Sequence, residues 1–361
     1  MAYTAIDDPE AYFQTKIYTG NATDETAITL DGDTDMQPDL IWIKDRDAQQ
    51  HNRLMDSVRG LKQILRSDSD DTDLSSFPYT AGSADGLHSI DSDGFTLTED
   101  DSDLGFNGSG SKTVAWCWKA GTSFSNDASA TSIGSIDSAG SVSDTSGFSI
   151  VSWTGTGSNG TIKHGLSSTP KMIFCKRLDA GDTWWSYNET VGAGGQVYLN
   201  GSAAAGSDGG VLWNTTAPTS SVFSLGTNTG VNGSGGTYVA FAFADVQGFS
   251  KVGSYEGVNN ADGPFIYLGF RPSFILIKDI DGANSWHIRD NKRSTYNPSI
   301  NFLVPDSASA EVTAGEKIDI LSNGFKIRQT GGKLNDAETY VYMAFAEAPF
   351  VNSNGVPNNA R

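Results

Sequence analysis

Histidine and cysteine are the residue types in this sequence whose side chains do chemistry most readily. A general base must be oriented by a partner, and a structural zinc site needs ligand pairs at short, regular spacing. The four histidines meet neither requirement, because they are scattered along the chain: His51, His88, His164 and His287. Cys117 and Cys175 each lie in a short apolar run, which predicts two buried free thiols rather than a disulfide. We therefore expect no enzyme and no metal centre built on these residues.

Carboxylates are numerous, with 43 Asp and Glu residues, so calcium binding and glycoside hydrolysis both have to be weighed. Asp31, Asp33 and Asp35 alternate as the first ligands of a helical calcium loop do. Trp42 stands at the twelfth position, where that loop needs Glu, so we expect no cofactor, with a loose calcium site between loops as the alternative. A glycosidase needs one carboxyl group in an apolar site, whereas these carboxylates gather in turn-like stretches. A polysaccharide depolymerase is therefore the least favoured function.

Aromatic side chains give the one signal for ligand binding. Four of them lie 14 to 17 positions after a proline that recurs along the chain: Trp184, Trp185, Tyr187 and Trp286. Such rings could stack on a sugar or contact a partner protein, and we name these four as candidate contact residues. The alternative, which is the more frequent use of tryptophan, is that they fill a core.

The charge balance restricts the partners. The chain has 24 basic and 43 acidic residues and a net charge of −19, so a phosphate backbone is repelled and no nucleic-acid partner is expected. No apolar run reaches the roughly 18 residues needed to span a membrane. The first ten residues lack the basic and apolar regions of a secretion signal. We therefore expect assembly in a host cytoplasm without membrane insertion.

Stretches of related sequence occur three times and define the elements that must position these side chains. The first anchor is a proline, any residue, four apolar residues, a lysine and, three positions later, an aspartate, at 38–47, 170–179 and 272–281. A second anchor is a phenylalanine at Phe95, Phe223 and Phe325, and a third is an apolar, aromatic-containing run at 114–118, 239–243 and 341–345. An aromatic residue and a glycine open each copy at 18–20, 153–155 and 255–257, and a turn precedes the third anchor at Asn107, Asn232 and Asn335.

The anchors predict β-strands. The four apolar residues after the proline show no alternation, which is typical of a strand covered on both faces. The lysine and aspartate that follow predict a charged strand exit and a turn. One helix is expected, at 56–66, where Val58, Leu61 and Leu65 share a face, although Gly60 weakens this prediction.

We predict an all-β fold of three tandem related β-sandwich units, jelly-roll or lectin-like, with antiparallel strands and very little helix. Unit 1 spans 1–119, unit 2 spans 148–247 and unit 3 spans 248–350. A connecting arm rich in Ser, Gly and Asp occupies 120–147, and a C-terminal tail occupies 351–361. The arm is either a disordered linker or an ordered segment that pairs with a strand.

Several stretches resemble an uncharacterised repeat family found in virion structural proteins of marine tailed phages, often labelled tail fibre. The resemblance rests on the sequences at 8–15, 56–60, 92–95, 114–119, 148–157 and 344–350, so it extends over most of the chain. It implies a component of the phage particle and brings no active site with it.

The combined expectation is a non-enzymatic virion structural protein that assembles with other virion proteins and as a homo-oligomer, for instance a trimer. We expect a tail- or fibre-associated component that contacts the host surface, for example through a glycan. The alternative is a head decoration protein that binds the capsid.

Overall fold

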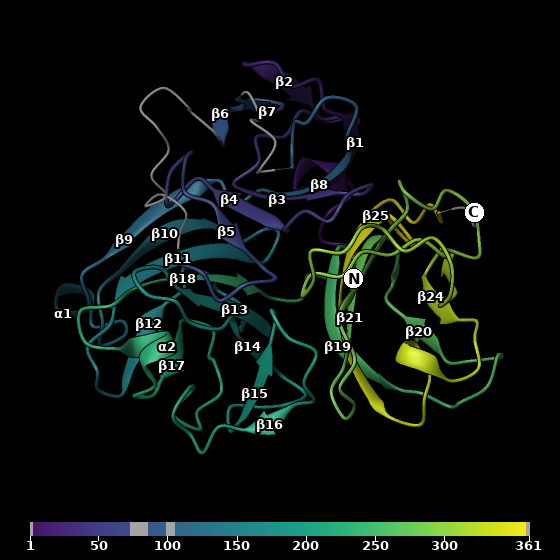
Figure 1. Cartoon of the computed structure of the whole chain (residues 1–361). Coiled ribbons are helices and arrows are strands. Elements are labelled where there is room, and N and C mark those ends of the chain that lie inside the picture. Colours follow the sequence, from purple (N-terminus) through teal and green to yellow (C-terminus); the bar gives the residue numbers. More distant parts are fainter. Residues whose placement is uncertain (1–2, 73–85, 99–104, 359–361) are drawn as a thin grey trace.

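The computed structural model describes residues 3–72, 86–98 and 105–358, which form β-strands joined by turns (Figure 1). The strands run from β1 to β25 and pair in antiparallel ladders. Helix in the described residues is limited to single turns: η1 (Pro9–Ala11), α1 (Ala128–Thr131), α2 (Thr229–Asn232) and η3 (Gly332–Leu334). The predicted all-β class, with antiparallel strands and very little helix, is confirmed.

We keep the names unit 1, unit 2 and unit 3 for the residue ranges 1–119, 148–247 and 248–350. The described residues of unit 1 contain a five-stranded and a three-stranded sheet, in the upper part of Figure 1. The larger sheet has the order β1 (Phe13–Thr19), β8 (Lys112–Trp118), β3 (Leu40–Asp45), β4 (Arg53–Asp56) and β5 (Leu65–Arg66). The smaller has the order β2 (Thr26–Thr29), β7 (Gly94–Leu97) and β6 (Leu87–Asp91). Ile28 and Phe95 of the smaller sheet belong to the same buried cluster as Ile41 and Ile43 of the larger, so the two sheets enclose a core.

Unit 2 is built around an eight-stranded sheet. Its order is β16 (Gly206–Ser207), β15 (Gly195–Tyr198), β14 (Trp185–Asn188), β13 (Met172–Arg177), β18 (Thr237–Phe243), β11 (Phe148–Thr154), β10 (Ser138–Ser143) and β9 (Thr122–Asn126). A small sheet pairs β12 (Gly160–Lys163) with β17 (Val222–Leu225). Ile162 and Phe223 of the small sheet are buried with Val151 and Ile173 of the large one.

The arm at 120–147 is ordered and supplies β9, α1 and β10. The strand β10 pairs with β11 of unit 2, and β9 pairs with β10. The side chain of Asp127 caps α1 by accepting hydrogen bonds from the backbone N–H groups of Ser129 and Ala130. Of the two alternatives for the arm, the ordered segment is the one observed, and it widens the sheet of unit 2.

Unit 3 has a four-stranded sheet with the order β19 (Ser250–Glu256), β25 (Thr339–Pro349), β21 (Phe270–Asp279) and β22 (His287–Asp290). Its smaller sheet has the order β20 (Phe265–Tyr267), β24 (Gly324–Ile327) and β23 (Ile318–Leu321). One strand order therefore occurs three times: β1-β8-β3-β4, β11-β18-β13-β14 and β19-β25-β21-β22. The tail folds back through a bridge between Val351 and Pro357, and its last residues, 359–361, lie outside the described part of the chain.

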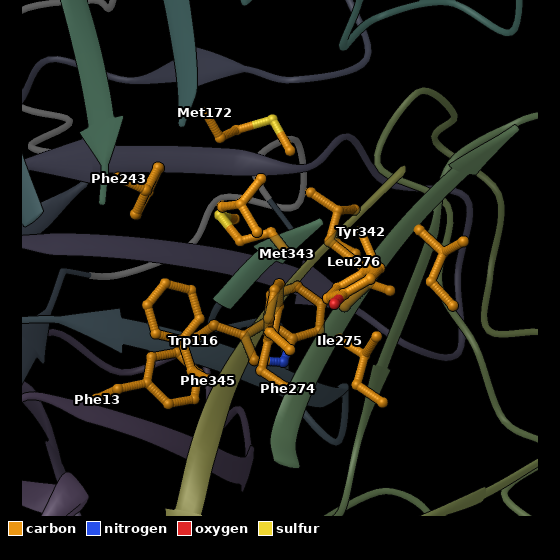
Figure 2. Close-up of a cluster of buried hydrophobic side chains, with 14 of the residues drawn as sticks. Phe13, Trp116, Met172, Phe243, Phe274, Ile275, Leu276, Tyr342, Met343 and Phe345 are labelled. Atoms are coloured by element: carbon orange, nitrogen blue, oxygen red, sulfur yellow. The ribbon is translucent and has the colours of Figure 1, made fainter. Parts of the chain in front are cut away.

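The apolar run after each recurring proline is buried on both faces, as its lack of alternation predicts. In β3, Ile41 and Ile43 face the core within unit 1, whereas Leu40 and Trp42 face a second core that all three large sheets share. Figure 2 shows part of this shared core, where side chains from the three units point toward one another: Phe13, Trp116, Met172, Phe243, Phe274 and Phe345. The units therefore pack face to face around one centre.

In each unit, the asparagine of the turn before the third anchor makes the same hydrogen bond to the backbone. The buried side chain of Asn107 accepts a hydrogen bond from Asn21 N at 3.2 Å and donates one to Thr98 O at 3.0 Å. The first of these bonds recurs in the other units, where Asn232 accepts from Thr156 N and Asn335 from Val258 N, each at 2.9 Å. These asparagines satisfy backbone groups that would otherwise be buried without a partner.

The helix predicted at 56–66 is wrong. Asp56 ends β4, and its carboxylate accepts hydrogen bonds from Val58 N and Arg59 N and pairs with Arg59 Nε at 2.5 Å. These bonds would cap a helix, but Gly60 has a φ of 108°, and Leu65 and Arg66 form β5, which pairs with β4, so the segment forms a turn instead.

Candidate functional site

Three of the four aromatic residues predicted to contact a ligand are buried. Trp184 and Trp286 are 0 % exposed and Tyr187 is 4 % exposed. Trp185 is half-buried, and its Nε1 donates to Asp182 Oδ1 at 3.3 Å. The core alternative therefore describes Trp184, Tyr187 and Trp286, whose rings offer no face to a ligand from solution.

The two buried tryptophans join neighbouring units. Trp184 of unit 2 donates from Nε1 to Arg66 O of unit 1 at 2.7 Å, and Trp286 of unit 3 donates to Tyr198 O of unit 2 at the same distance. Each tryptophan stands directly before its strand, β14 or β22.

Asn52 occupies the corresponding position before β4 of unit 1. Its Nδ2 donates to Val304 O of unit 3 at 3.2 Å, and its side chain is fully buried. Unit 2 thus bonds to unit 1, unit 3 to unit 2, and unit 1 to unit 3. These three bonds close the units into a head-to-tail ring, which we call the three-unit ring.

Three aromatic side chains from the same position of the third anchor meet at the centre of the ring. Trp118 lies 6.3 Å from Phe243 and 5.7 Å from Phe345, and Phe243 lies 5.9 Å from Phe345, measured between ring centroids. All three contacts are edge-to-face, the geometry that aromatic quadrupoles favour. The equal placement of these rings in the three large sheets is what a threefold arrangement requires.

A charged network also crosses the boundary between units 1 and 3. Trp116 Nε1 donates to Asp290 Oδ2 at 3.0 Å, and Asp290 pairs with Arg293 Nε at 2.5 Å. Glu311 pairs with Arg293 and with Arg46 of unit 1, at 2.7 Å in both cases. Because Arg293 and Asp290 are fully buried, removing one partner would leave an uncompensated charge in the core.

The lysines of the first anchor lie at the ends of their strands, as predicted, and they are buried there. Lys44, Lys176 and Lys278 are each 0 % exposed, and burial lowers the pKa of each to about 8. Lys176 Nζ donates to Asp70 O of unit 1 at 3.0 Å, and Lys278 Nζ donates to Ser202 O of unit 2 at 3.2 Å. Lys176 and Lys278 therefore bind a backbone carbonyl of the preceding unit, whereas Lys44 Nζ donates to Asp45 O of its own unit at 2.7 Å.

Two of the four histidines, His164 and His287, and both cysteines are buried. Burial lowers the pKa of His164 to about 4 and that of His287 well below its usual range. Cys117 and Cys175 are buried free thiols, as predicted, and burial raises the pKa of both.

Asp31 and the pair Asp279 and Glu338 bear on the calcium and hydrolysis alternatives. Asp31 pairs with Lys16 at 3.5 Å and with Lys292 at 3.2 Å, and the described residues hold no cluster suited to a metal ion. A hydrogen bond shared with Asp279 raises the pKa of Glu338 to about 7. A glycosidase pair is separated by about 5 Å or more, so two carboxyl groups in direct contact do not have that geometry.

A surface hollow that sequence reasoning missed lies where unit 2 passes into unit 3. It has a volume of about 470 Å³ and is lined by Tyr3, Asp245, Gln247, Lys251 and Tyr267, among others. Tyr3 is 61 % exposed and Tyr267 is 54 % exposed. Both rings therefore leave aromatic surface in contact with water at the hollow.

The walls of the hollow are fixed by the fold. Gln247 Nε2 donates to Tyr3 O at 3.2 Å and Ala5 N donates to Gln247 O at 3.0 Å, so the N-terminal segment is held against the junction between units 2 and 3. Lys251 Nζ donates to Tyr267 O at 2.8 Å and lies 5.8 Å from the centre of the Tyr267 ring. Asp245 accepts from Val252 N at 2.7 Å, and burial raises its pKa.

Comparison with known proteins gives one match. A family model described as a domain of unknown function, DUF7483, matches residues 8–349. No curated protein and no solved structure matches the chain. Among the described residues, no helix has the length and apolar character needed to cross a membrane.

Proposed function

We propose that this chain, which belongs to the DUF7483 family, is a non-enzymatic structural protein of a tailed-phage particle. The observation that carries the proposal is the three-unit ring, because a closed ring with a shared aromatic core is a rigid building block. The resemblance of the sequence to virion proteins is the reason for placing the chain in a phage particle. Assembly with other virion proteins and as a homo-oligomer is part of the same proposal.

The three recurring sheets are copies of one β-sandwich unit in this proposal. Support comes from the strand order that occurs three times and from the three equivalent bonds between units. Their counterparts in the sequence are the three sets of anchors.

Within the particle, we place the chain at the tail or a fibre, in contact with the host surface. The exposed Tyr3 and Tyr267 support this placement, since aromatic rings beside a hollow can pack on a ligand of the host surface. The alternative is a head decoration protein, and the threefold arrangement of the ring favours it, because three equivalent units match a threefold position of a capsid lattice.

Quantitative mass spectrometry of purified particles tests both placements. Tens of copies per particle are expected for a tail component, and hundreds would favour head decoration. Absence of the chain from purified particles would refute the structural role. Release of reducing ends from host polysaccharide by the purified chain would refute its non-enzymatic character.

A further inference from the structure

We infer that the hollow walled by Tyr3, Lys251 and Tyr267 binds a neutral saccharide of the host surface. The inference rests on the proposed function, because it names the ligand class through which such a particle component would contact its host. It differs from the tryptophan-based contact expected from spacing alone, since Trp184 and Trp286 are buried between the units.

The internal repetition shows that the fold does not need an aromatic residue at Tyr267. Ile266 of β20 pairs with Phe325, as Ile28 of β2 pairs with Phe95 in unit 1 and Ile162 of β12 pairs with Phe223 in unit 2. Tyr267 therefore corresponds to Thr29 and Lys163.

The neighbouring position behaves in the same way. Phe265 is 45 % exposed on the same side of β20, and its counterparts are Ala27 and Thr161. Units 1 and 2 thus form this edge with small or polar residues, and only unit 3 places two aromatic rings there. The packing that the three units share therefore does not account for the exposed rings of unit 3 at this edge.

The hollow has the groups that a sugar needs. One face of a pyranose ring consists of C–H groups, which pack on an aromatic ring, while its rim of hydroxyls needs hydrogen-bond donors and acceptors. Tyr3 and Tyr267 supply aromatic faces, and Asp245, Gln247 and Lys251 supply acceptors and donors along the walls. The volume of about 470 Å³ lies within the range of small-ligand sites.

The charge of the chain selects the kind of sugar. A net charge of −19 disfavours the approach of acidic polysaccharides, and the lysine of the hollow, Lys251, donates to Tyr267 O. A neutral saccharide is therefore favoured over a sulfated or uronic-acid polymer.

The experiment measures binding of the purified full chain to a printed array of neutral di- to tetrasaccharides. Tyr267→Thr introduces the residue that unit 1 carries at the same place, so it should fold normally. We expect it, and Tyr3→Ala, to weaken binding by about tenfold or more, as the loss of one ring contact implies. Tyr296→Thr is the matched control, because Tyr296 is 85 % exposed outside the hollow, and it should bind as the unchanged chain does.

Two results would overturn the inference: no retention of any array saccharide by the unchanged chain, or retention that Tyr267→Thr does not reduce. Thermal melting of each variant separates loss of binding from loss of folding. The proposed function is tested separately from the saccharide site: absence of the chain from purified particles would refute it. A chain that is present in particles and shows no Tyr267-dependent binding refutes the saccharide site alone.

Discussion

At the scale of the residue, Trp184 and Trp286 each place an indole N–H against a carbonyl of the preceding unit. Asn52 does the same with a side-chain amide, so residues of different type make one kind of bond at three equivalent boundaries. Losing such a donor leaves a carbonyl without a partner at a packed interface, which costs more than the bond contributes when it is present.

Trp286→Phe should lower the free energy of unfolding by about 1–3 kcal/mol, because it removes the donor to Tyr198 O and leaves a small void. Trp185→Phe is the control, since Trp185 is half-buried and bonds within its own unit at 3.3 Å. Urea denaturation measures both. Equal losses in the two variants would show that the bond between units contributes nothing.

Buried histidines make stability depend on pH. Burial holds the folded-state pKa of His164 at about 4 and that of His287 well below its usual range, whereas an unfolded histidine titrates near about 6.5. Between those values the unfolded chain binds protons that the folded chain does not, so the unfolding free energy falls as pH drops from about 6.5 toward 4. Urea midpoints at pH 7.5 and 5 measure the loss, and His287→Leu should reduce it. An unchanged loss in this variant would exclude His287 as a cause.

At the scale of the element, the sequence was most informative where the chain repeats. The strands after the recurring prolines, β3, β13 and β21, follow from apolar runs bounded by Pro and Lys. The helix at 56–66 failed because apolar periodicity does not reveal that Gly60 has a φ of 108° or that Leu65 and Arg66 pair with β4. The pattern also could not show the burial of Lys176, whose Nζ donates to Asp70 O, 106 residues away in the sequence.

Gly257 illustrates why the opening anchor has a glycine. A Cβ atom at this position would lie 1.8 Å from the backbone oxygen of Asp336, next to the turn that Asn335 holds. Gly257→Ala should therefore destabilise the chain by about 1–3 kcal/mol. Gly194→Ala is the control, because no atom lies within 4 Å of its Cβ, and it should change stability by less than about 0.5 kcal/mol. Chemical denaturation of both variants checks this, and a neutral Gly257→Ala would contradict the close approach.

At the scale of the whole molecule, the second face of each large sheet is covered by the other two units, as the cluster in Figure 2 shows. Sequence patterns predicted that both faces of the strands after the prolines were covered. They could not show which residues cover the second face, because the contacts join distant parts of the chain: Trp184 and its acceptor Arg66 are 118 residues apart. The hollow at Tyr267 was not predicted for a related reason. That Tyr267 replaces Thr29 of unit 1 and Lys163 of unit 2 becomes evident only when the strand pairings of the three units are compared.

A shared core predicts that the units do not unfold separately. Differential scanning calorimetry of the full chain should show one transition whose calorimetric and van't Hoff enthalpies agree. Trp286→Phe should shift that transition to lower temperature without splitting it. Two or three resolved transitions in the unchanged chain would mean that the units are independent domains.

The most direct test of the account is a cryo-electron microscopy map of the phage particle whose genome encodes the chain. We predict that each copy appears as one compact body of three lobes around a common centre, in fixed contact with neighbouring particle proteins. Separate lobes strung along a filament, or a particle from which the chain is missing, would contradict the account.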